Sequence, residues 1–593
     1  MAFLPITKEE MEQRGWEQPD FVLVTGDAYV DHPSFGTAII SRQLERFGYK
    51  VAILAQPDWR SAEDFRRFGR PRLGFLINAG NVDSMVNHYS VFKHRRRQDS
   101  YSPGGKTGNR PDRAVIVYSS RAKEAYKGVP VIIGGIEASL RRLAHYDYWE
   151  DRVRRSILLD AKADILIYGM GERAVIEIAE ALDSGLEARD VTWIRGTVVR
   201  GTESDEDYTA FDDTEILPPW SEVKENKDAY GKSFAIQYRN NEWIKGKRLV
   251  ERYEDHLAVV QNPPQEPLST EELDEIYELP YEGTYHPSYE ALGGVPGIKE
   301  VEFSIVSNRG CFGGCAFCAL TYHQGREVRA RSKASIVKEA ERLAKKPNFK
   351  GYIHDVGGPT ANFRGPACDK QLEHGVCKHR DCLYPKPCGQ MKIDHSDYLD
   401  VLRAVRKVSG VKKVFIRSGI RFDYLMADKK TDFMEELCKY HISGTLKVAP
   451  EHCSARVLAR MRKPEKSVFE AFRKKYKETN ERLGLKQYMI PYFISSHPGS
   501  DLNDAVELAL FLKKTGFVPD QVQDFYPTPG TLATCEYYTE KDPFTGEPVY
   551  VAKTLEEKKM QRALLHFNKK ENRPLVEKAL KKIGRYDLIG VLR

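Results

Sequence analysis

Three cysteines in one short run constrain this chain more than any other feature of its sequence. The run from Arg309 to Ala319 spaces Cys311, Cys315 and Cys318 as CxxxCxxC, which supplies three clustered thiols and no fourth. A 4Fe-4S cube has four irons to ligate, so three cysteines leave one iron with open coordination. That iron can chelate the amino and carboxylate groups of S-adenosylmethionine and pass one electron to its sulfonium. The pattern therefore predicts formation of a 5′-deoxyadenosyl radical.

The neighbouring residues fit a loop that wraps a cluster. Glycines within the run permit close approach of the backbone and of its N–H groups. Phe317 is expected to pack on the adenine of the bound molecule. Residues 301–306 predict a strand, because they are β-branched and aromatic, and Ser332 is expected to cap a following helix. Strand, cluster loop and helix form the order that such a site requires.

Zinc is the alternative for these cysteines. A zinc knuckle continues as C-x2-C-x4-H-x4-C, and Cys315, Cys318 and His323 match its first three ligands. The fourth position is Val328, which cannot bind a metal. The knuckle is incomplete, and the sequence favours the iron-sulfur interpretation.

Length and composition predict a soluble protein of two or three domains. The chain has 593 residues, a mean hydropathy of -0.53 and no apolar run near the roughly 20 residues of a membrane span. Its start lacks the basic and then apolar order of a signal peptide, so we expect a cytoplasmic protein. Ten cysteines in such a protein indicate reduced thiols and metal ligation. A net charge of +7 neither demands nor excludes a nucleic-acid partner.

Residues 1–254 alternate strands and helices, which predicts a doubly wound parallel sheet of Rossmann-like type. The expected strands are residues 21–25, 51–55, 72–77, 115–118, 131–136 and 164–169. Their order resembles the cobalamin-binding-like domain that precedes many radical S-adenosylmethionine barrels. The corrinoid signature DxHxxG is disturbed here, however, because Asp31 and His32 are adjacent and Gly36 comes one residue late. A Rossmann-like domain that has another ligand, or that only closes the barrel, is favoured over one that binds cobalamin.

The remaining chain divides into three parts. Residues 255–295 are rich in proline and acidic side chains, and predict a linker or a partly helical strap. Residues 296–531 predict a partial (β/α)6 barrel, and residues 532–593 a helical tail. The expected barrel strands are residues 303–307, 351–356, 413–417, 444–448, 489–494 and 521–525.

Polar residues gather after these strands, at the barrel edge where function is expected. Two of the loops are candidates for binding S-adenosylmethionine, through backbone groups for its ammonium and donors for its carboxylate and ribose. The loops after the fourth and fifth strands and the end of the sixth strand supply candidate catalytic groups. The cofactor-binding candidates are Gly357, Gly358, Pro359, Thr360, Arg417 and Ser418, and the catalytic candidates are Glu451, His452, His497 and Asp524.

A second set of cysteines follows the second barrel strand, in an insert at residues 368–388. Cys368, Cys377, Cys382 and Cys388 lie in a polar stretch with no apolar period that would make them core. Four thiols can close a zinc tetrahedron or hold an auxiliary iron-sulfur cluster, and their spacing decides neither. The sequence predicts a second metal centre here.

These motifs, in this order, resemble the YgiQ-type family of radical S-adenosylmethionine (radical SAM) proteins over essentially the whole chain. The matching motifs after the first cysteines are Gly-Gly-Pro-Thr-Ala-Asn, the four-cysteine insert, Lys-Val-Ala-Pro-Glu-His, Ile-Pro-Tyr-Phe-Ile-Ser-Ser-His-Pro-Gly and Gln-Asp-Phe-Tyr-Pro-Thr-Pro. The resemblance implies the Rossmann-like domain, the cluster at Cys311, Cys315 and Cys318, and the helical tail. It implies no particular reaction.

We therefore expect a radical SAM enzyme that abstracts hydrogen from an unknown substrate in the barrel mouth. It would need a reducing partner such as ferredoxin or flavodoxin, and RNA is a possible substrate. One alternative is transfer of a methyl or methylthio group to tRNA or protein. A non-catalytic iron-sulfur or zinc factor that binds RNA is the other, although such a factor has no need of an open iron.

Overall fold

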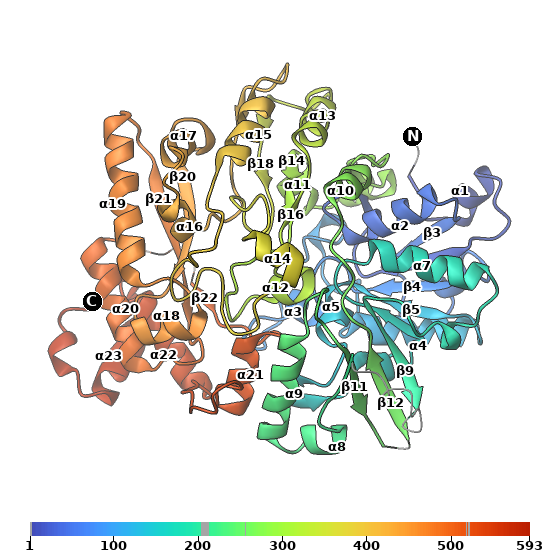
Figure 1. Cartoon of the computed structure of the whole chain (residues 1–593), viewed down its shortest axis with the longest axis horizontal. Helices are drawn as coiled ribbons and strands as arrows, with labels where there is room; N and C mark the ends of the chain where they lie inside the picture. The colour runs from blue at the N-terminus through green and yellow to red at the C-terminus, as the bar shows by residue number, and fades with distance from the viewer. Residues whose placement is uncertain (1–2, 203–212, 255, 518, 520–521, 593) are drawn as a thin grey trace. The chain divides into compact units, whose positions relative to one another are not determined.

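The structure, a computed structural model, describes residues 3–202, 213–254, 256–517, 519 and 522–592 (Figure 1). They form two compact units. The first comprises Met1–Glu302 with Tyr322–Gln324, and the second comprises Phe303–Thr321 with Gly325–Arg593.

A nine-stranded sheet forms the centre of the first unit (Figure 1). Five neighbouring strands are parallel, in the order β3-β1-β4-β5-β8, and four more continue the sheet as β9-β12-β11-β10. The predicted doubly wound sheet is therefore confirmed. The parallel strands are β1 (Phe21–Thr25), β3 (Val51–Ala55), β4 (Gly74–Asn78), β5 (Val131–Ile133) and β8 (Ile165–Ile167); the others are β9 (Thr197–Thr202), β10 (Thr214–Ile216), β11 (Arg248–Arg252) and β12 (Leu257–Gln261).

Helices cover both faces of this sheet. Alternate side chains of a strand point to opposite faces, so each parallel strand contributes to two cores. On one face, α2 (Gly36–Arg46) and α7 (Glu172–Asp183) pack against residues such as Leu23 and Ile53. On the other, α4 (Ala114–Ala125) packs against Val22 and Val24.

The predicted strand at residues 115–118 is wrong, because these residues lie in helix α4. Val115, Tyr118 and Ala122 are buried on one side of the helix, at spacings that a helical period produces. An apolar run of four residues fits a strand and a buried helix turn equally well. The residues that follow, Ser-Ser-Arg-Ala-Lys-Glu-Ala, carry the helix onward and decide the outcome.

The stretch expected as a linker or strap is folded onto the first unit. Its first residues form β12 of the sheet, and β13 (Thr284–Tyr285) pairs with β2 (Val30–Asp31). Between them, α10 (Thr270–Tyr277) begins with a capping box.

The second unit contains the barrel strands, paired in parallel as β14 with β18, β17 with β19, and β20 with β21 and then β22. Helices including α13 (Lys333–Ala344), α15 (Ser396–Arg406), α19 (Lys466–Arg482) and α20 (Leu502–Thr515) connect them (Figure 1). The predicted strands are confirmed in type, although residues 298–301 form the short helix α11 (Ile298–Val301), and the first strand begins three residues later than expected. The strand predicted at residues 351–356 is divided into two short strands, and Gln521, at the start of the last predicted strand, lies outside the described residues. The strands are β14 (Ser304–Val306), β17 (Tyr352–Ile353), β18 (Asp355–Gly357), β19 (Lys413–Val414), β20 (Thr445–Glu451), β21 (Tyr488–Ser495) and β22 (Gln523–Asp524).

The C-terminal residues are helical, as predicted. Helices α21 (Leu532–Thr539), α22 (Leu555–Leu565) and α23 (Arg573–Lys582) follow the last strand. Met560 and Leu564 of α22 share a core with Ala505 and Ala509 of α20. Among the helices described, none combines the length and the apolar character needed to cross a membrane.

Candidate functional site

The cysteines Cys311, Cys315 and Cys318 lie in a loop between β15 (Asn308–Arg309) and α12 (Ala319–Gln324). All three are half-buried and in the free thiol form. Gly310, which opens the loop, has a φ of 77° and a position where a Cβ would stand 1.9 Å from the carbonyl oxygen of Glu327. No residue with a side chain fits there, so this glycine is needed to turn the chain into the loop.

Hydrogen-bond donors meet all three sulfur atoms, and those at Cys318 are the backbone N–H groups of Leu320 and Thr321. The Gly313 N–H and the Thr360 hydroxyl each lie 3.4 Å from Sγ of Cys311. Nη1 of Arg421 lies 3.4 Å from Sγ of Cys315. Burial raises the pKa of the Cys311 thiol, and raises that of Cys318 to about 12, so metal ligation is needed to deprotonate these thiols at neutral pH. The donors suit thiolate ligands, which is the form that an iron-sulfur cluster takes up.

No group of three His, Cys, Asp or Glu side chains in the described ranges is gathered as one metal ion would require. A single zinc ion holds each sulfur at about 2.3 Å, which brings its ligands close together. Cysteines that ligate different irons of one cluster stand further apart. Val328, at the missing knuckle position, is fully buried and apolar. The knuckle therefore lacks its fourth ligand in the structure as well.

Two helices and a small core hold this loop in place. The Ala316 N–H donates to the carbonyl oxygen of Met461, the last residue of α18 (Ala455–Met461), at 3.1 Å. The Ala533 N–H of α21 donates to the carbonyl oxygen of Ala316 at 2.9 Å. Phe312 stacks on Phe363 with 3.7 Å between ring centroids. The first helix of the tail is thus part of the support of the cysteine loop, a role that sequence reasoning missed.

The Gly-Gly pair after β18 is closely surrounded by this chain's own side chains. A Cβ on Gly357 would stand 1.7 Å from the Ser418 hydroxyl, and one on Gly358 would stand 2.6 Å from Oδ1 of Asn308. Pro359 is half-exposed, whereas Thr360 is buried and reaches Cys311. We expected the glycines to leave room for a substrate ammonium. In this structure the room at their Cβ positions is taken by Ser418 and Asn308.

The next strand end forms a turn that a carboxylate caps. Asp355 accepts from the backbone N–H groups of Arg417 and Ser418, at 2.8 and 3.2 Å, and from the Ser418 hydroxyl at 2.5 Å. Burial raises the pKa of the Asp355 carboxyl. The Arg417 side chain is exposed, and only Ser418 is drawn into the structure.

Backbone strain marks the ends of β20 and β21. Glu451 has a φ of 69°, just after a register shift in the β20–β21 ladder, and Ser496 has a φ of 58°. Residues other than glycine rarely adopt a positive φ, and residues with such strained backbone angles concentrate at functional sites. Burial raises the pKa of Glu451, whose carboxylate lies 3.7 Å from Nζ of the buried Lys463. Lys463 is a further residue that sequence reasoning missed.

The residues that follow these strained positions are two buried histidines, His452 and His497. Burial lowers their pKa values to about 3 and about 4, so both are neutral at physiological pH. His452 accepts the Ser454 N–H at Nδ1, 3.0 Å away, and must carry its proton on Nε2. His497 donates from Nδ1 to the carbonyl oxygen of Pro498 at 2.8 Å, which leaves Nε2 as a bare acceptor.

His497 Nε2 is buried and has no hydrogen-bond partner among the described residues. The imidazole stands edge-on to Phe317, with 5.8 Å between ring centroids, and to Phe525. The last catalytic candidate, Asp524, forms an ion pair with Arg562 of α22 and accepts from the Ser495 hydroxyl at 3.0 Å. Of the four catalytic candidates, His497 alone has a fully buried polar atom without a hydrogen-bond partner among the described residues.

The second cysteine set lies beside the first. Burial raises the pKa of the Cys382 thiol to about 12, and the nearby thiols of Cys368 and Cys377 add to this effect. Cys382 and Cys311 pack against the same small core. The neighbouring Asp381 carboxylate lies 3.2 Å from the Cβ position of Gly314 in the cluster loop. Cys388 donates its N–H to the carbonyl oxygen of Cys382 at 2.8 Å, which closes a turn at the end of the insert.

In the first unit, the strand-end position expected to receive a ligand is filled by side chains. The order β3-β1-β4 places a topological switch point beside β1, where doubly wound sheets bind their ligands. Arg110 is fully buried there, in ion pairs with Asp27 at 3.0 Å and Asp99 at 2.9 Å, and it donates to the carbonyl oxygen of Ala79. Burial raises the pKa of Asp27 to about 6.

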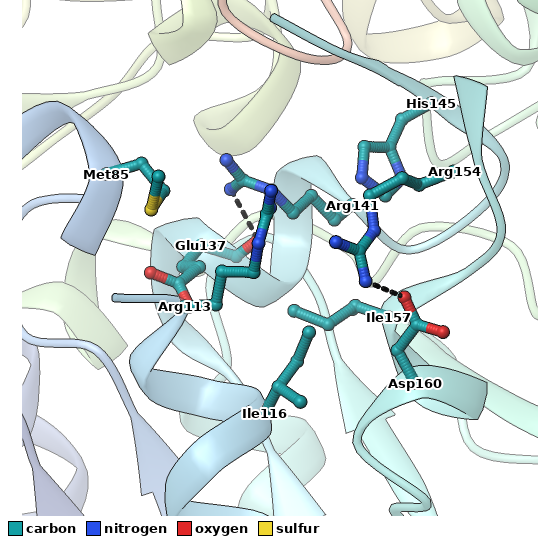
Figure 2. Close-up of a pocket in the computed structure, with 9 residues that line it drawn as sticks. All are labelled: Met85, Arg113, Ile116, Glu137, Arg141, His145, Arg154, Ile157 and Asp160. Carbon is teal, nitrogen blue, oxygen red and sulfur yellow. Dashed lines mark hydrogen bonds and ion pairs between the residues drawn. The ribbon is translucent and has the colours of Figure 1, made fainter. Parts of the chain in front are cut away.

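His32 and Asp31, the remnant of a corrinoid signature, are buried, and Asp31 forms an ion pair with Arg42. Neither side chain is exposed in this structure. A hollow nearby (Figure 2) is lined by three arginines, each paired with a carboxylate: Arg113 with Asp147, Arg141 with Asp83, and Arg154 with Asp160.

Comparison with known families accounts for nearly the whole chain. The Radical SAM N-terminal family matches residues 3–304, the Radical SAM superfamily residues 305–512, and a domain of unknown function, DUF3362, residues 520–593. The fold and the cysteine loop thus belong to a radical SAM enzyme. A radical SAM protein needs a 4Fe-4S cluster, S-adenosylmethionine and a source of electrons.

Two close relatives identify the family. The chain is 56% identical over 590 residues to a UPF0313 protein of Clostridium botulinum (strain Kyoto / Type A2), covering 100% of this chain and 91% of that protein. It is 56% identical over 588 residues to a UPF0313 protein of Clostridium perfringens (strain ATCC 13124), covering 99% and 88%. The chain belongs to the UPF0313 family, the YgiQ-type family that its motifs resemble.

One solved structure is also similar to this chain. The radical S-adenosylmethionine methyltransferase TsrM from Kitasatospora setae aligns with a TM-score of 0.48 and 14% sequence identity, over 87% of this chain and 76% of that chain.

Proposed function

We propose that Cys311, Cys315 and Cys318 hold a 4Fe-4S cluster with which this enzyme cleaves S-adenosylmethionine. One observation carries the proposal. Hydrogen-bond donors of Gly313, Thr360 and Arg421 lie within reach of cysteine sulfurs in a single half-buried loop. When bound and reduced, the cluster supplies one electron to the sulfonium, giving methionine and a 5′-deoxyadenosyl radical.

This chain's part is to bind, orient and shield the reactants. The backbone from Gly357 to Thr360 leads directly to the cluster loop, since the Thr360 hydroxyl reaches Cys311, and S-adenosylmethionine would lie along it. Arg417 and Ser418 form the adjoining turn, and the exposed guanidinium of Arg417 is available for the methionine carboxylate. Phe317, one residue before Cys318, would cover the adenine.

The substrate would be oriented by His497. Its bare Nε2 accepts a hydrogen bond, so it selects a hydroxyl or amine group near the carbon that loses hydrogen. Phe317 and Phe525 flank the imidazole and exclude water from it. Glu451, His452 and Asp524 surround the same strand ends, where Lys463 and Arg562 hold the two carboxylates.

A second candidate is transfer of a methyl or methylthio group to tRNA or protein. The position of the second cysteine set favours it, because Asp381 and Cys382 lie against the cluster loop and its core. A metal centre at Cys368, Cys377, Cys382 and Cys388 could hand over a sulfur-bearing group or an electron. Cobalamin is not part of this candidate, since Arg110 and its partners fill the switch point of the first unit.

Anaerobic purification followed by chemical reduction tests the primary proposal. We expect the wild-type protein to convert S-adenosylmethionine to methionine and 5′-deoxyadenosine, and ferredoxin or flavodoxin to replace the chemical reductant. Cys315→Ala should abolish the cleavage and the part of the iron-sulfur signal that comes from the CxxxCxxC loop, while Cys438→Ala, at a buried thiol in the core, should leave both intact. Cleavage by Cys315→Ala at the wild-type rate would refute the cluster assignment. A metabolite and RNA-nucleoside comparison of a deletion strain would identify the substrate.

A further inference from the structure

The guanidinium of Arg421 donates to a cysteine of the CxxxCxxC loop. This arginine precedes α16 (Phe422–Ala427), and its side chain is only 8% exposed. Nη1 lies 3.4 Å from Sγ of Cys315 and 3.2 Å from the carbonyl oxygen of Gly313. The other edge of the guanidinium forms a fork with Asp423, at 2.9 and 2.7 Å. The side chain is therefore fixed at both edges, with one edge on the loop that would carry the cluster.

A buried chain of side chains fixes the backbone of this arginine. The Asn362 amide accepts the Arg421 N–H at 2.9 Å and donates to the Arg421 carbonyl oxygen at 3.2 Å. It also donates to Nε2 of His395 at 3.0 Å, and His395 Nδ1 donates to Asp428 at 2.7 Å. These directions agree only if His395 is neutral with its proton on Nδ1. His395 is further held by stacking on Phe433, with 4.4 Å between ring centroids.

This arrangement has a consequence for the charge around the cysteines. The reduction potential of an iron-sulfur cluster depends on its net charge, on hydrogen bonds to its sulfurs and on its exposure. A cluster gains one negative charge on reduction, and a cation nearby stabilises that state more than the oxidised one. Arg421 is always charged, is buried and donates directly to a ligand sulfur, so little solvent screens it. Asp423, on its far edge, partly offsets the effect.

We propose that Arg421 raises the reduction potential of the cluster, and that Asn362, His395 and Asp428 act as positioning residues that hold it there. The inference rests on the proposed function, because it needs the cluster at Cys311, Cys315 and Cys318. It goes beyond that function by assigning the residue that sets how readily the partner can reduce the cluster. No sequence motif indicates this role, since only the fold brings residue 421 to Cys315.

The test is a redox titration of the anaerobic protein, with the reduced cluster followed by electron paramagnetic resonance. Removing Arg421 alone would strand a buried Asp423, so Arg421→Met is combined with Asp423→Leu, which replaces the ion pair by apolar groups of similar size. We expect the midpoint potential of this double variant to fall below that of the wild type. Asp423→Asn leaves the guanidinium without its countercharge, and should move the potential the opposite way, above the wild type.

The matched control removes another buried ion pair of the same unit. Arg331 and Glu339 form such a pair, with side chains 1% and 4% exposed, and Arg331 also donates to the carbonyl oxygen of Val306 and to the Ser335 hydroxyl. Arg331→Met with Glu339→Leu should leave the potential unchanged. His395→Gln, which weakens only the support of Arg421, should lower the potential by less than the double variant at position 421.

The outcomes separate the two proposals. A wild-type protein with no cluster, or a Cys315→Ala protein that cleaves S-adenosylmethionine at the wild-type rate, would refute the proposed function itself. If the cluster is present and depends on Cys315, the midpoint potential of any Arg421 or Asp423 variant that still carries the cluster tests the inference. A wild-type potential in that variant, or a shift as large in the Arg331 control, would overturn it. An unchanged potential in His395→Gln would remove the positioning role.

Discussion

Replacing Phe363 by alanine tests whether the cluster loop depends on the small core beneath it. Phe363 is fully buried, stacks on Phe312 from within the loop, and meets Tyr424 edge-on. Truncating a buried phenylalanine to alanine costs about 3 to 5 kcal/mol. Each 1.4 kcal/mol changes an equilibrium constant by a factor of ten. If the whole cost destabilises the closed form of the loop, the equilibrium constant for opening the loop rises by about a hundredfold to a few thousandfold. No cysteine is altered by this change.

The assay is the rate at which an iron chelator removes the cluster under anaerobic conditions. We expect the rate of iron release from Phe363→Ala to exceed that of the wild type by up to a few thousandfold. Phe363→Leu keeps most of the side-chain volume, so its rate should rise by about tenfold or less. Tryptophan fluorescence supplies the control for folding of the first unit, because all six tryptophans lie between Trp16 and Trp243. Iron release from Phe363→Ala at the wild-type rate would refute the idea that this core holds the loop closed.

The remaining predictions concern three other sites. A second metal should be lost when Cys382 and Cys388 are both changed to Ser, yet retained when the three cysteines of the CxxxCxxC loop become Ala; Mössbauer spectroscopy with metal analysis would distinguish iron from zinc, and finding no metal would refute this centre. Gly358→Val should weaken S-adenosylmethionine binding measured by titration calorimetry because its side chain would displace Asn308, and unchanged affinity would exclude the Gly-Gly pair from the site. Burial raises the pKa of Glu251 from 4.5 to about 7, so the first unit loses stability as pH rises through that window. Glu251→Gln should remove that loss, about 3 kcal/mol, in urea unfolding followed by tryptophan fluorescence at pH 5 and 8, and an equal pH dependence in the variant would contradict it.

Most of the fold could be predicted because it rests on local patterns. Apolar runs of five or six residues between helical periods identified the buried parallel strands, and Ser332 indeed accepts the Ser335 N–H at the start of α13. The strand prediction for residues 115–118 was wrong because a run of four apolar residues is too short to show either a strand or a helix period. The stretch 255–295 was expected to stand apart because of its prolines, but its first strand pairs with a distant one, β9, which local composition does not reveal.

The candidate site divides in the same way. Spacing alone identifies thiols that can share a cluster, because cysteine chemistry is carried by the residue itself. The support of the loop could not be predicted, since it comes from Met461 and Ala533, each more than 140 positions further along the chain. Their contribution is a backbone carbonyl and a backbone N–H, which every residue except proline possesses. Such contacts leave no trace in the sequence.

The two arginines of the run Arg417-Ser-Gly-Ile-Arg421 show where sequence reasoning ends. Both follow the same strand, and both carry five donors suited to a carboxylate, so the sequence gives no ground to separate them. The structure leaves Arg417 exposed in a turn capped by Asp355, while the start of α16 turns Arg421 inward to Asp423 and Cys315. An exposed guanidinium can bind an incoming substrate, whereas a buried one acts through its field on what is already bound. The same residue type therefore supports two different roles four positions apart, and tertiary contacts alone determine which role each arginine takes.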